Sequence, residues 1–450
     1  MEKLSNNNAF TLEGKPPPAQ AAAIAFQHLL AMAGGILTAP FLIAAGMGLS
    51  ASETSYLISS ALVISGFATL LQINRIGPIG AGLLSLQGTS FAFVGPLIFS
   101  YQTIIGDQTA DEALGAIFGS AALCSLIMFL LSFFLRYLKN IITPNVSGTT
   151  VMLLGVTLVF TTLQNLVREF DSAGGFTGTG FEIIILSGAV LATTILISRS
   201  SVVWLRVGSI TFGLALGFGI SLLFNSSDLS GLRTQEVYFI PEIGRYPLSI
   251  DFQVVAIVLP IFLVSTMESI GDLTATNSLS GQKTGDAAYW LRLRGGIAAC
   301  AINSFVASLF STFPNTTFSQ NNGVIRLTGV CSRHVGLYAA LFLIIFGCIP
   351  FVANLFQTIP PAVIYGSTIL MFGLVVVSGY KIIVESLPTG RDWILVGLAC
   401  VLAYLIGLFV DSVPNLPKTF VSVLSFPVST GAFLAMFFES VIPKKRKRNV

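Results

Sequence analysis

Long apolar runs, separated by short charged or turn-forming stretches, fill almost the whole of this chain. Of its 450 residues, 54% are hydrophobic and only 10% are charged. A soluble domain is usually about 25% charged, so this composition cannot cover a water-facing surface. Each run is close to the length of about 20 apolar residues that spans a bilayer. The sequence therefore predicts an all-α protein that crosses a membrane many times.

The apolar runs predict about fourteen spans, in two sets of seven. The expected spans of the first half are 19–47, 54–73, 79–102, 113–135, 141–163, 181–198 and 202–224. The expected spans of the second half are 253–276, 293–312, 315–330, 335–354, 359–380, 392–410 and 418–441. The third and tenth spans have polar centres, GTSFAF and NTTFSQNNG, which are unfavourable in a helix that faces lipid.

The basic residues predict the orientation of these spans. If the N-terminus is inside, the inner loops carry most of the Lys and Arg, and the outer loops carry acids such as Asp107, Glu169 and Asp171. Cytoplasmic loops are enriched in Lys and Arg, so both termini are expected to be cytoplasmic. The basic run 444–448 could bind nucleic acid, but directly after an apolar span it is interpreted as a membrane anchor.

An eight-residue pattern recurs seven spans apart. Residues 148–155 read GTTVMLLG and residues 366–373 read GSTILMFG, and proline precedes both copies. A weaker match joins GTSF at 88–91 to NTTF at 315–318. Because seven is odd, the second half would be inverted in the membrane, as in many secondary transporters that bind substrate at the repeat interface. Chance similarity between Gly- and Thr-rich helices is the alternative.

Two carboxylates lie within the eighth span. Glu268 and Asp272 are four residues apart and share one face of a helix. Charged groups inside a bilayer are costly and usually functional, and two neighbouring carboxylates repel unless one holds a proton. The pair therefore suits a substrate ligand with a proton-responsive partner. Alternatively, both carboxylates face an aqueous vestibule or pair with a distant Arg.

Carboxamides are concentrated in the tenth span, where Gln320 and Asn321 begin the string QNNG that ends at Gly323. Each carboxamide brings donors and an acceptor, which suits the alternating edge of a heterocycle. Gly323 is expected to permit a strand-to-helix turn or a close backbone approach. The alternative is a purely structural hydrogen-bond cluster between helices. Arg326, in the same span, is interpreted as structural or gating.

The polar residues of two other spans complete the candidate site. His28 is the one histidine within a predicted span, and it is equally suited to a proton relay and to a helix–helix hydrogen bond. Gln87 and Thr89 of the third span are expected to face the tenth span. The sequence has no ATP-binding loop, hydrolase motif or zinc spacing, so no catalytic residue, metal site or cofactor is expected. Transport driven by an ion gradient, without enzymatic activity, is the simplest interpretation.

These motifs resemble a known family. QNNGVIRLTG at 320–329 is similar to the signature of the nucleobase–ascorbate transporters, also called nucleobase-cation symporter-2 proteins. Gln27-His28, GTSF at 88–91 and the Glu268-x-x-Gly-Asp272 pattern resemble that family in order and spacing. The full signature, followed by Ser-Arg, most resembles the xanthine and uric acid permeases.

The resemblance implies a seven-plus-seven inverted repeat with short extended stretches in the third and tenth spans. It also implies an elevator-type importer of the plasma membrane (the bacterial inner membrane) that is driven by a proton gradient and dimerises through a gate domain. The implied divisions are a cytoplasmic N-terminal tail at 1–18, a core at 19–135 and 253–354, a gate at 141–224 and 359–441, and a basic cytoplasmic tail at 442–450.

The family's site residues map onto matching positions of this chain. The resemblance implies that Glu268 accepts hydrogen bonds from ring N–H groups of a purine and that Gln320 binds the opposite edge. Phe91 is expected to stack on the ring. Ala92 and Asn321 are also expected at the substrate. The residues expected to support the pocket or the proton coupling are His28, Asp272, Thr89 and Gly323.

The chain departs from the family pattern at two positions. Cys300 stands where many members have an acid, which shifts the expected proton coupling to the other polar residues. Ala92 stands where some xanthine-selective relatives have Asn, and its smaller side chain is expected to admit uric acid as well as xanthine. The predicted substrate is xanthine and/or uric acid. The alternatives are a uracil or other nucleobase permease, or an anion transporter of the same fold, which a fixed carboxylate disfavours.

Overall fold

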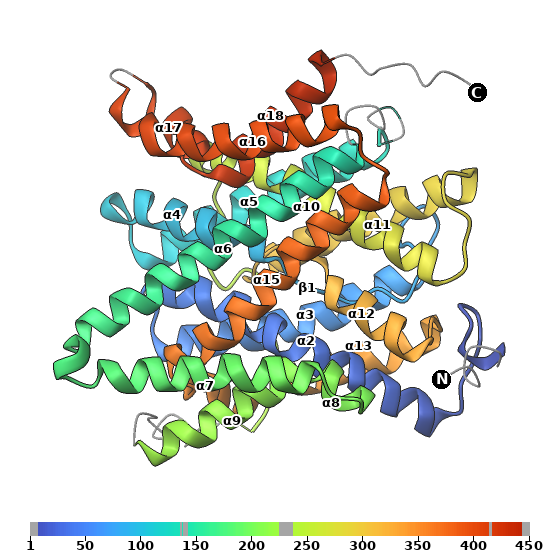
Figure 1. Cartoon of the computed structure of the whole chain (residues 1–450), viewed down its shortest axis with the longest axis horizontal. Coiled ribbons are helices and arrows are strands. Elements are labelled where there is room, and N and C mark those ends of the chain that lie inside the picture. The colour runs from blue at the N-terminus through green and yellow to red at the C-terminus, as the bar shows by residue number, and fades with distance from the viewer. Residues whose placement is uncertain (1–7, 136, 138–142, 225–236, 414–415, 443–450) are drawn as a thin grey trace.

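The computed structural model describes residues 8–135, 137, 143–224, 237–413 and 416–442. Within these ranges the protein is mostly helical, and its two strands are each three residues long (Figure 1). The predicted all-α membrane architecture is confirmed. The basic run 444–448, predicted to be an anchor, lies outside the described residues.

The main elements coincide with the expected spans. Those of the first half are α2 (Pro18–Gly46), α3 (Ala51–Ile73), β1 (Gln87–Thr89), η2 (Phe91–Phe93), α4 (Val94–Ile104), α5 (Ala110–Ser132), α6 (Pro144–Ser172), α7 (Gly180–Ser198), α8 (Val203–Val207) and α9 (Ser209–Leu223). Those of the second half are α10 (Phe252–Leu279), α11 (Ala287–Leu309), β2 (Asn315–Thr317), α12 (Ser319–Thr328), α13 (Arg333–Gly347), α14 (Pro350–Gln357), α15 (Pro361–Glu385), α16 (Gly390–Phe409), α17 (Lys418–Leu424) and α18 (Pro427–Val441).

Local sequence explains where many helices begin. Ser50 with Glu53, and Thr109 with Glu112, form capping boxes at the starts of α3 and α5. In each box, side chains bind backbone N–H groups that the first helical turn leaves without partners. Helices α6, α15 and α18 instead begin with proline, whose missing N–H costs nothing at that position.

Eight helices of the described chain are long and apolar enough to cross a membrane. A ninth span results if α13 and α14, which meet at a bend of 74°, count as one. The total of fourteen spans therefore stays a prediction. One detail of the expected loops is wrong: Glu169 and Asp171 lie in the last turns of α6, because this helix continues to the left-handed turn at Gly174.

The helix contacts repeat in the two halves of the chain. Helix α3 packs on α13, and the elements seven spans away, α11 and α5, also pack together. The pairs α7·α9 and α16·α18 correspond in the same way, as do α2·α4 and α10·α12. Helices α6 and α15, which carry the repeated eight-residue pattern, pack on each other and run antiparallel, since Gly148 approaches Gly379 and Gly155 approaches Phe372. This exchange of partners supports the predicted inverted repeat.

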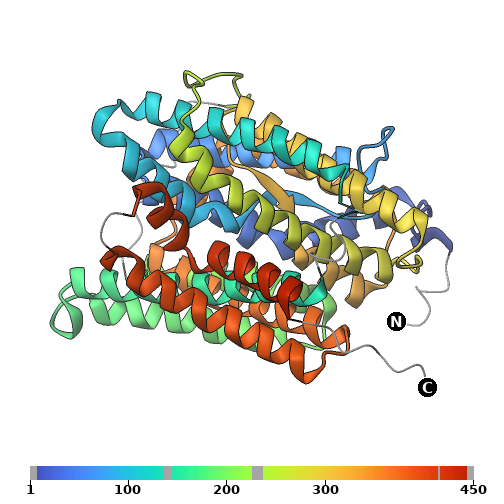
Figure 2. The same ribbon diagram turned by 90° about the horizontal axis from the view of Figure 1, so that it is seen from above.

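The elements form two groups that lie side by side in Figure 2. The strand group contains α2 to α5, α10 to α14 and both strands. The helix group contains α6 to α9 and α15 to α18, and it lies below the strand group in Figure 2. Helix α10 lies at the boundary, where it contacts α6, α17 and α18.

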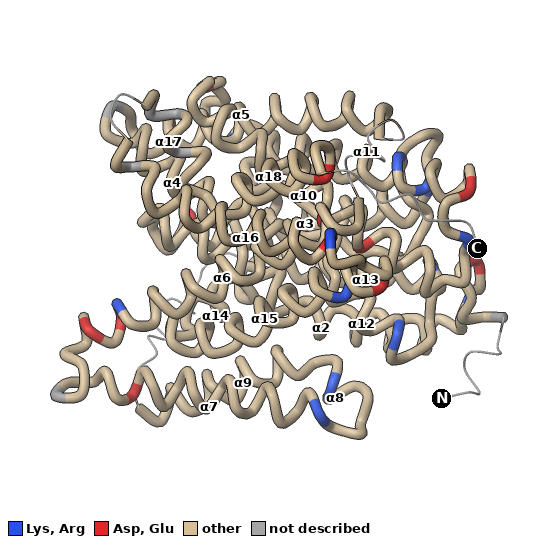
Figure 3. Tube along the Cα trace, turned by 45° about the horizontal axis from the view of Figure 1, so that its top comes forward, with Lys and Arg blue, Asp and Glu red and all other residues tan. Residues whose placement is uncertain are grey.

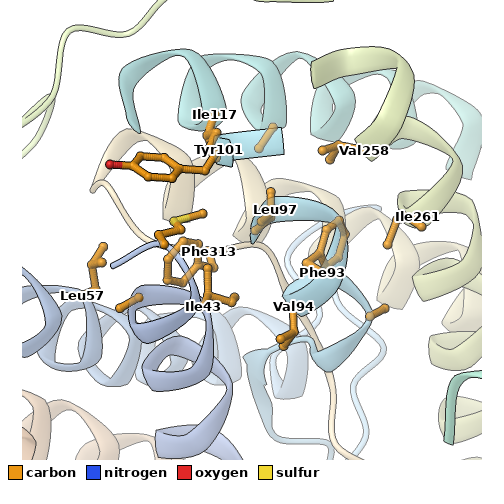
Figure 4. Packing of buried hydrophobic residues seen from close by; sticks show 14 of the residues in the cluster. Ile43, Leu57, Phe93, Val94, Leu97, Tyr101, Ile117, Val258, Ile261 and Phe313 are labelled. Carbon is orange, nitrogen blue, oxygen red and sulfur yellow. The ribbon is translucent and has the colours of Figure 1, made fainter. Parts of the chain in front are cut away.

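Apolar side chains from distant parts of the sequence fill the interior of the strand group. In Figure 4, Ile43, Leu57, Phe93, Val258 and Phe313 gather from five different segments. Because lipid tails are as apolar as these side chains, close packing rather than exclusion from water holds such helices together.

Charged residues lie mainly at the ends of the helices. Figure 3 shows most Lys and Arg of the described chain on the side that also carries both termini. On that side the segment before α2 packs against the start of α13. The backbone N–H of Cys331 donates to Phe10 O (2.9 Å), and Arg333 forms an ion pair with Glu13. The described part of the N-terminal tail is therefore docked on the strand group.

Candidate binding site between the two helix groups

The two strands lie side by side at the centre of the strand group, and the place where they pair is called the crossing. Strands β1 and β2 pair antiparallel, with Gln87 opposite Thr317 and Thr89 opposite Asn315. The extended stretches predicted for the third and tenth spans are therefore confirmed, as is the expectation that Gln87 and Thr89 face the tenth span. Each strand leads directly into a helix, at Phe91 and at Ser319. Two helix N-termini thus lie near the crossing: Ser90 Oγ caps that of η2 by accepting from the Ala92 N–H, and that of α12 has no side-chain cap.

A small cavity lies beside the crossing, at the boundary of the two groups. We call it the Glu268 cavity. Its lining from the strand group comprises Thr89, Ser90, Phe91, Glu268, Thr316, Thr317, Phe318, Ser319 and Gln320, and its lining from the helix group comprises Leu154, Leu158 and Val375. Its volume is about 20 Å³, which is enough for a single water molecule. A larger occupant does not fit in this conformation.

Glu268 and Gln320 are the two strongly polar side chains of this cavity. Both are half-buried, and within the described chain neither side chain makes a hydrogen bond. The carboxylate offers acceptors, and the carboxamide offers two donors and an acceptor. A buried polar group without a partner is costly, so these groups are suited to a ligand that supplies the missing bonds.

The second carboxylate has a different environment. Asp272 is buried, and its Oδ2 accepts a hydrogen bond from Thr317 Oγ1 at 2.9 Å. One turn earlier, Ser269 Oγ lies 2.7 Å from Thr316 Oγ1. Helix α10 therefore holds strand β2 through two side chains, while Glu268 on the same helix stays free for a ligand.

Asn321 and His28 lie behind the cavity rather than in its lining. Asn321 Nδ2 donates to the carbonyl of Leu84 at 2.6 Å, which ties the start of α12 to the segment before β1. His28 is fully buried beside the Asn321 side chain. Among the described residues, neither ring nitrogen of His28 has a partner with hydrogen-bond geometry. The two residues form one buried polar contact between α2 and α12.

Cys300 is part of the network that holds the strands. Its Sγ lies 3.6 Å from both Oε1 and Nε2 of Gln87, and 3.8 Å from Ser269 Oγ. The thiol therefore joins β1 to α10 at the position where an acid was expected from the family pattern. It makes weak hydrogen bonds there and has no place in the cavity lining.

Aromatic rings close one side of the cavity. The Phe91 ring lies 5.0 Å from that of Phe372, edge to face, and 6.5 Å from that of Phe318. Thr89 is buried in the lining, and its hydroxyl lacks a partner among the described residues. Ala92, which was expected to contact substrate, lies in the neighbouring cavity instead. The helical turn that follows Phe91 directs its side chain away from Glu268.

The expectation for Gly323 is wrong in its geometry. The turn from strand to helix lies at Phe318, five residues earlier, and Gly323 is an exposed residue within α12. A Cβ atom at Gly323 would meet no atom within 4 Å, so no close backbone approach requires glycine there. Arg326 is exposed in the last turn of the same helix and forms no ion pair within the described chain.

The helix-group side of the site was not predicted from the sequence. Leu158 and Val375 are ordinary apolar residues of long helices, with no sequence signal that marks them, whereas Leu154 lies in the repeated pattern at 148–155, which could have indicated it. The hydroxyls of Thr316 and Thr317 were likewise missed as partners of α10. The NTTF match to the third span was the signal that could have indicated them.

Two larger cavities follow the same boundary on either side. The Asn165 cavity, of about 310 Å³, is lined by α2, η2, α4 and α10 on one side and by α6, α15 and α18 on the other. The Trp290 cavity has a volume of about 660 Å³. It lies between the end of α10 and the start of α11 on one side and the start of α6 and the end of α15 on the other. Gly271, one turn from Glu268, lies in its lining beside Ile382 of α15. The Glu268 cavity thus lies between two vestibules.

Comparison with known proteins identifies the family. The model of the Permease family matches residues 19–416. The chain is 36% identical over 444 residues to the xanthine permease XanP of Escherichia coli strain K12, covering 97% of this chain and 95% of that protein. It is 33% identical over 435 residues to XanQ, another xanthine permease of the same strain, covering 96% and 93%. The chain belongs to the nucleobase–ascorbate transporter family and is a multi-pass membrane protein, as its motifs predicted.

Solved structures show the same fold at low identity. The transmembrane domain of the bicarbonate transporter BicA of a cyanobacterium matches with a TM-score of 0.56 and 15% identity, covering 95% of this chain and 99% of that chain. The murine anion transporter Slc26a9, in an inward-facing state, matches with a TM-score of 0.59 and 12% identity, covering 94% and 69%. The fold is therefore shared with a bicarbonate transporter and an anion transporter.

Proposed function

We propose that this protein imports xanthine and/or uric acid across the plasma membrane together with protons. One observation carries the proposal: Glu268 and Gln320 present unpaired polar groups to one cavity at the boundary of two helix groups. The similarity to two bacterial xanthine permeases over nearly the full chain supports the purine class.

The site matches the chemistry of an oxopurine. The Glu268 carboxylate accepts hydrogen bonds from ring N–H groups, and the Gln320 carboxamide binds an edge that alternates acceptor and donor. The Phe91 ring packs on the flat face of the purine, since aromatic rings stack or meet edge to face. The N–H groups at the start of α12 add donors for a carbonyl oxygen of the substrate.

The two carboxylates of α10 explain the use of protons. Glu268 and Asp272 are one turn apart, and among the described residues no basic side chain lines the Glu268 cavity. A proton bound by Glu268 or Asp272 removes the repulsion between them, and the proton then crosses with the substrate. His28 lies on the far side of Asn321 and tunes the start of α12 rather than touching the substrate.

Transport by an elevator movement accounts for the arrangement of the cavities. The strand group is the core, at 19–135 and 253–354, and the helix group is the gate, at 141–224 and 359–441. As the core slides along the gate, the Glu268 cavity opens to the Asn165 cavity on one side and to the Trp290 cavity on the other. In the most apolar 18-residue stretch of each helix, only 28% of α7 and 22% of α16 is buried within the chain. These two gate helices therefore have exposed apolar surface on which a second copy can pack.

The alternatives differ in what the site must bind. A uracil or other nucleobase permease would use the same polar groups with a smaller or differently substituted ring. An anion transporter is favoured by the fold of BicA and Slc26a9, but a fixed carboxylate in the cavity repels anions.

The predicted orientation, with both termini in the cytoplasm, places the Trp290 cavity on the inner side.

Uptake in cells tests the proposal. Cells that lack their own purine carriers should accumulate labelled xanthine when they express this chain. Unlabelled uric acid should compete, uracil should compete weakly, and bicarbonate should not compete. A protonophore should collapse uptake, whereas removal of sodium should not. Expressing cells that accumulate no nucleobase would contradict the proposed function.

A variant connects this uptake to the site. Glu268→Gln keeps the shape of the side chain but removes its charge, so uptake should fall by a factor of about 100 or more, as for a lost charged hydrogen bond of about 3 kcal/mol. Asp111→Asn, at an exposed position in the first turn of α5, is the matched control and should transport normally. Full uptake by Glu268→Gln at equal expression would remove Glu268 from the substrate site.

A further inference from the structure

We propose that the Asn165 cavity is a second, weaker binding site for the same planar heterocycle, occupied before the substrate reaches Glu268. This inference rests on the proposed function. The volume of about 310 Å³ lies at the lower end of the range of about 300–1,000 Å³ for small-molecule sites. It is therefore large enough for a nucleobase, which the Glu268 cavity in this conformation is not.

The polar groups of the cavity lie on its gate side. Thr157, Thr161 and Asn165 follow one another at four-residue spacing along α6, and Tyr365 faces them from α15. Within the described chain, neither the Asn165 carboxamide nor the Tyr365 hydroxyl makes a hydrogen bond. An apolar cavity with a few unpaired polar groups is the usual form of a ligand site.

The core side of the cavity is apolar and aromatic. It is formed by residues such as Leu42, Phe91, Ala92 and Ile98, while Phe426 adds a ring from the gate. Flat apolar walls opposite a carboxamide suit a heterocycle better than a lipid chain, because the chain would leave the carboxamide unpaired. The occupant is therefore a planar ring with donors and acceptors on its edge.

The two sites are connected along α6. Phe91, Leu154 and Leu158 line both the Asn165 cavity and the Glu268 cavity. Leu154 and Asn165 are eleven residues apart, so the path is about 16 Å long. The edge-to-face contact of Phe91 with Phe372 closes it. Since Phe91 belongs to the core and Phe372 to the gate, movement of the core opens this contact, and the waiting substrate passes to Glu268.

Binding without the central site tests this proposal. Purified Glu268→Gln protein in detergent should still bind labelled xanthine weakly and saturably. Adding Asn165→Leu should weaken that binding about tenfold, which corresponds to one hydrogen bond of about 1.4 kcal/mol. Adding Gln164→Leu is the matched control, because this neighbouring carboxamide is exposed and outside the cavity lining. Equal binding by both double variants, or no saturable binding by Glu268→Gln, would overturn the second site.

A measurement in cells keeps the test valid if Glu268→Gln misfolds. Asn165→Leu alone should raise the KM for xanthine about tenfold and leave the maximal rate unchanged, since capture is impaired while the central site is intact. Gln164→Leu should leave both unchanged, and an unchanged KM in Asn165→Leu would refute the second site. If cells that express the wild-type protein take up no nucleobase, the proposed function itself is contradicted. Failure of the second site and failure of the proposed function are therefore distinguishable.

Discussion

The two helix groups accommodate buried polar side chains in different ways. In the strand group, some buried hydroxyls bond within their own helix, as those of Ser125 and Ser308 do, but other hydrogen bonds join segments far apart in the sequence. Asn303 Nδ2 donates to the carbonyl of Ala68 at 3.1 Å, and Ser60 Oγ donates to that of Phe310 at 3.0 Å. In the helix group, buried hydroxyls instead bond to the carbonyl four residues earlier in their own helix. Examples are Thr149, Thr150, Thr162, Thr194 and Thr368.

This difference matches the tasks proposed for the two groups. Cross-links between distant segments hold the strands and the Glu268 cavity as one rigid unit. Hydroxyls that are satisfied within their own helix leave a face without polar ties, along which another group can slide. The described hydrogen bonds that cross the boundary include Thr211 to the carbonyl of Leu30 (2.6 Å) and a weak contact of Thr150 with Met267 Sδ (3.7 Å). Breaking such bonds costs little compared with unfolding either group.

The largest effect on stability is expected from an exception within the helix group. Arg391 bonds to Glu439 Oε2 at 3.2 Å and to Asp392 Oδ1 at 3.1 Å, and Asn145 Nδ2 donates to the same Asp392 oxygen at 2.8 Å. This buried cluster ties α16, α18 and α6 together. Arg391→Ala leaves Glu439 buried without this cation, so the free energy of unfolding should fall by about 3–5 kcal/mol.

Thermal unfolding and uptake together check the Arg391 prediction. The Tm of the purified variant should fall clearly, while the KM for xanthine stays within about twofold of the wild-type value, a change of about 0.4 kcal/mol. Arg199→Ala, at an exposed position at the end of α7 without an ion pair in the described chain, is the control and should change neither quantity. A changed KM in Arg391→Ala would mean that the gate shapes the substrate site directly.

The next effect tests the cross-links of the strand group. Thr317→Val removes the hydrogen bond to Asp272 Oδ2 with almost no change in side-chain volume. A hydrogen bond to a charged group contributes about 1.5–3 kcal/mol, so stability should fall by that amount. Uptake should also fall in this variant, because β2 leads directly into the helix that carries Gln320. A variant with lowered Tm and normal uptake would separate this cross-link from the site.

The sequence predicted the strand group better than the helix group. Glu268, Asp272 and Gln320 were identified because charged and carboxamide groups are rare and costly within a span, and the structure brings them together around one strand crossing. The approximate bounds of the long spans followed from the apolar runs and from the charged or turn-forming residues between them. These features depend on local chemistry, which a sequence displays directly.

The parts that were not predicted depend on tertiary contacts. Ala92 was assigned to the substrate because it stands where some xanthine-selective relatives have Asn, whereas its place in the lining of the Asn165 cavity depends on the helical turn that begins at Phe91. Gly323 was expected to allow a strand-to-helix turn or a close approach of the backbone, because glycine permits both. Whether another atom lies near Gly323 depends on how α12 packs, which the sequence does not display. The Asn165 cavity was missed because Thr and Asn in an apolar helix have the same sequence pattern whether they line a cavity or bond to their own backbone.

A third prediction uses the internal repeat. Gly155 and Gly373 end the two copies of the eight-residue pattern, but their surroundings differ. A Cβ at Gly155 would lie 2.6 Å from the backbone N of Val376, whereas one at Gly373 would meet nothing within 4 Å. Gly155→Ala should therefore force α6 and α15 apart and lower stability by about 1–3 kcal/mol. Gly373→Ala, the matched control, should retain the wild-type Tm, and equal losses in the two variants would show that the repeat copies pack alike.

The smallest effect is the most direct test of the difference between the groups. Thr194→Val in α7 is the same substitution as Thr317→Val, and both side chains are buried. Thr194 Oγ1 donates to the carbonyl of Val190 at 2.7 Å, which already accepts the hydrogen bond of the helix backbone. Losing the hydroxyl therefore strands no buried partner, and stability should change by less than about 0.5 kcal/mol. If Thr194→Val lowers the Tm as much as Thr317→Val, the hydroxyls of the helix group stabilise the fold as much as those of the strand group. The proposed difference between the two groups would then be wrong.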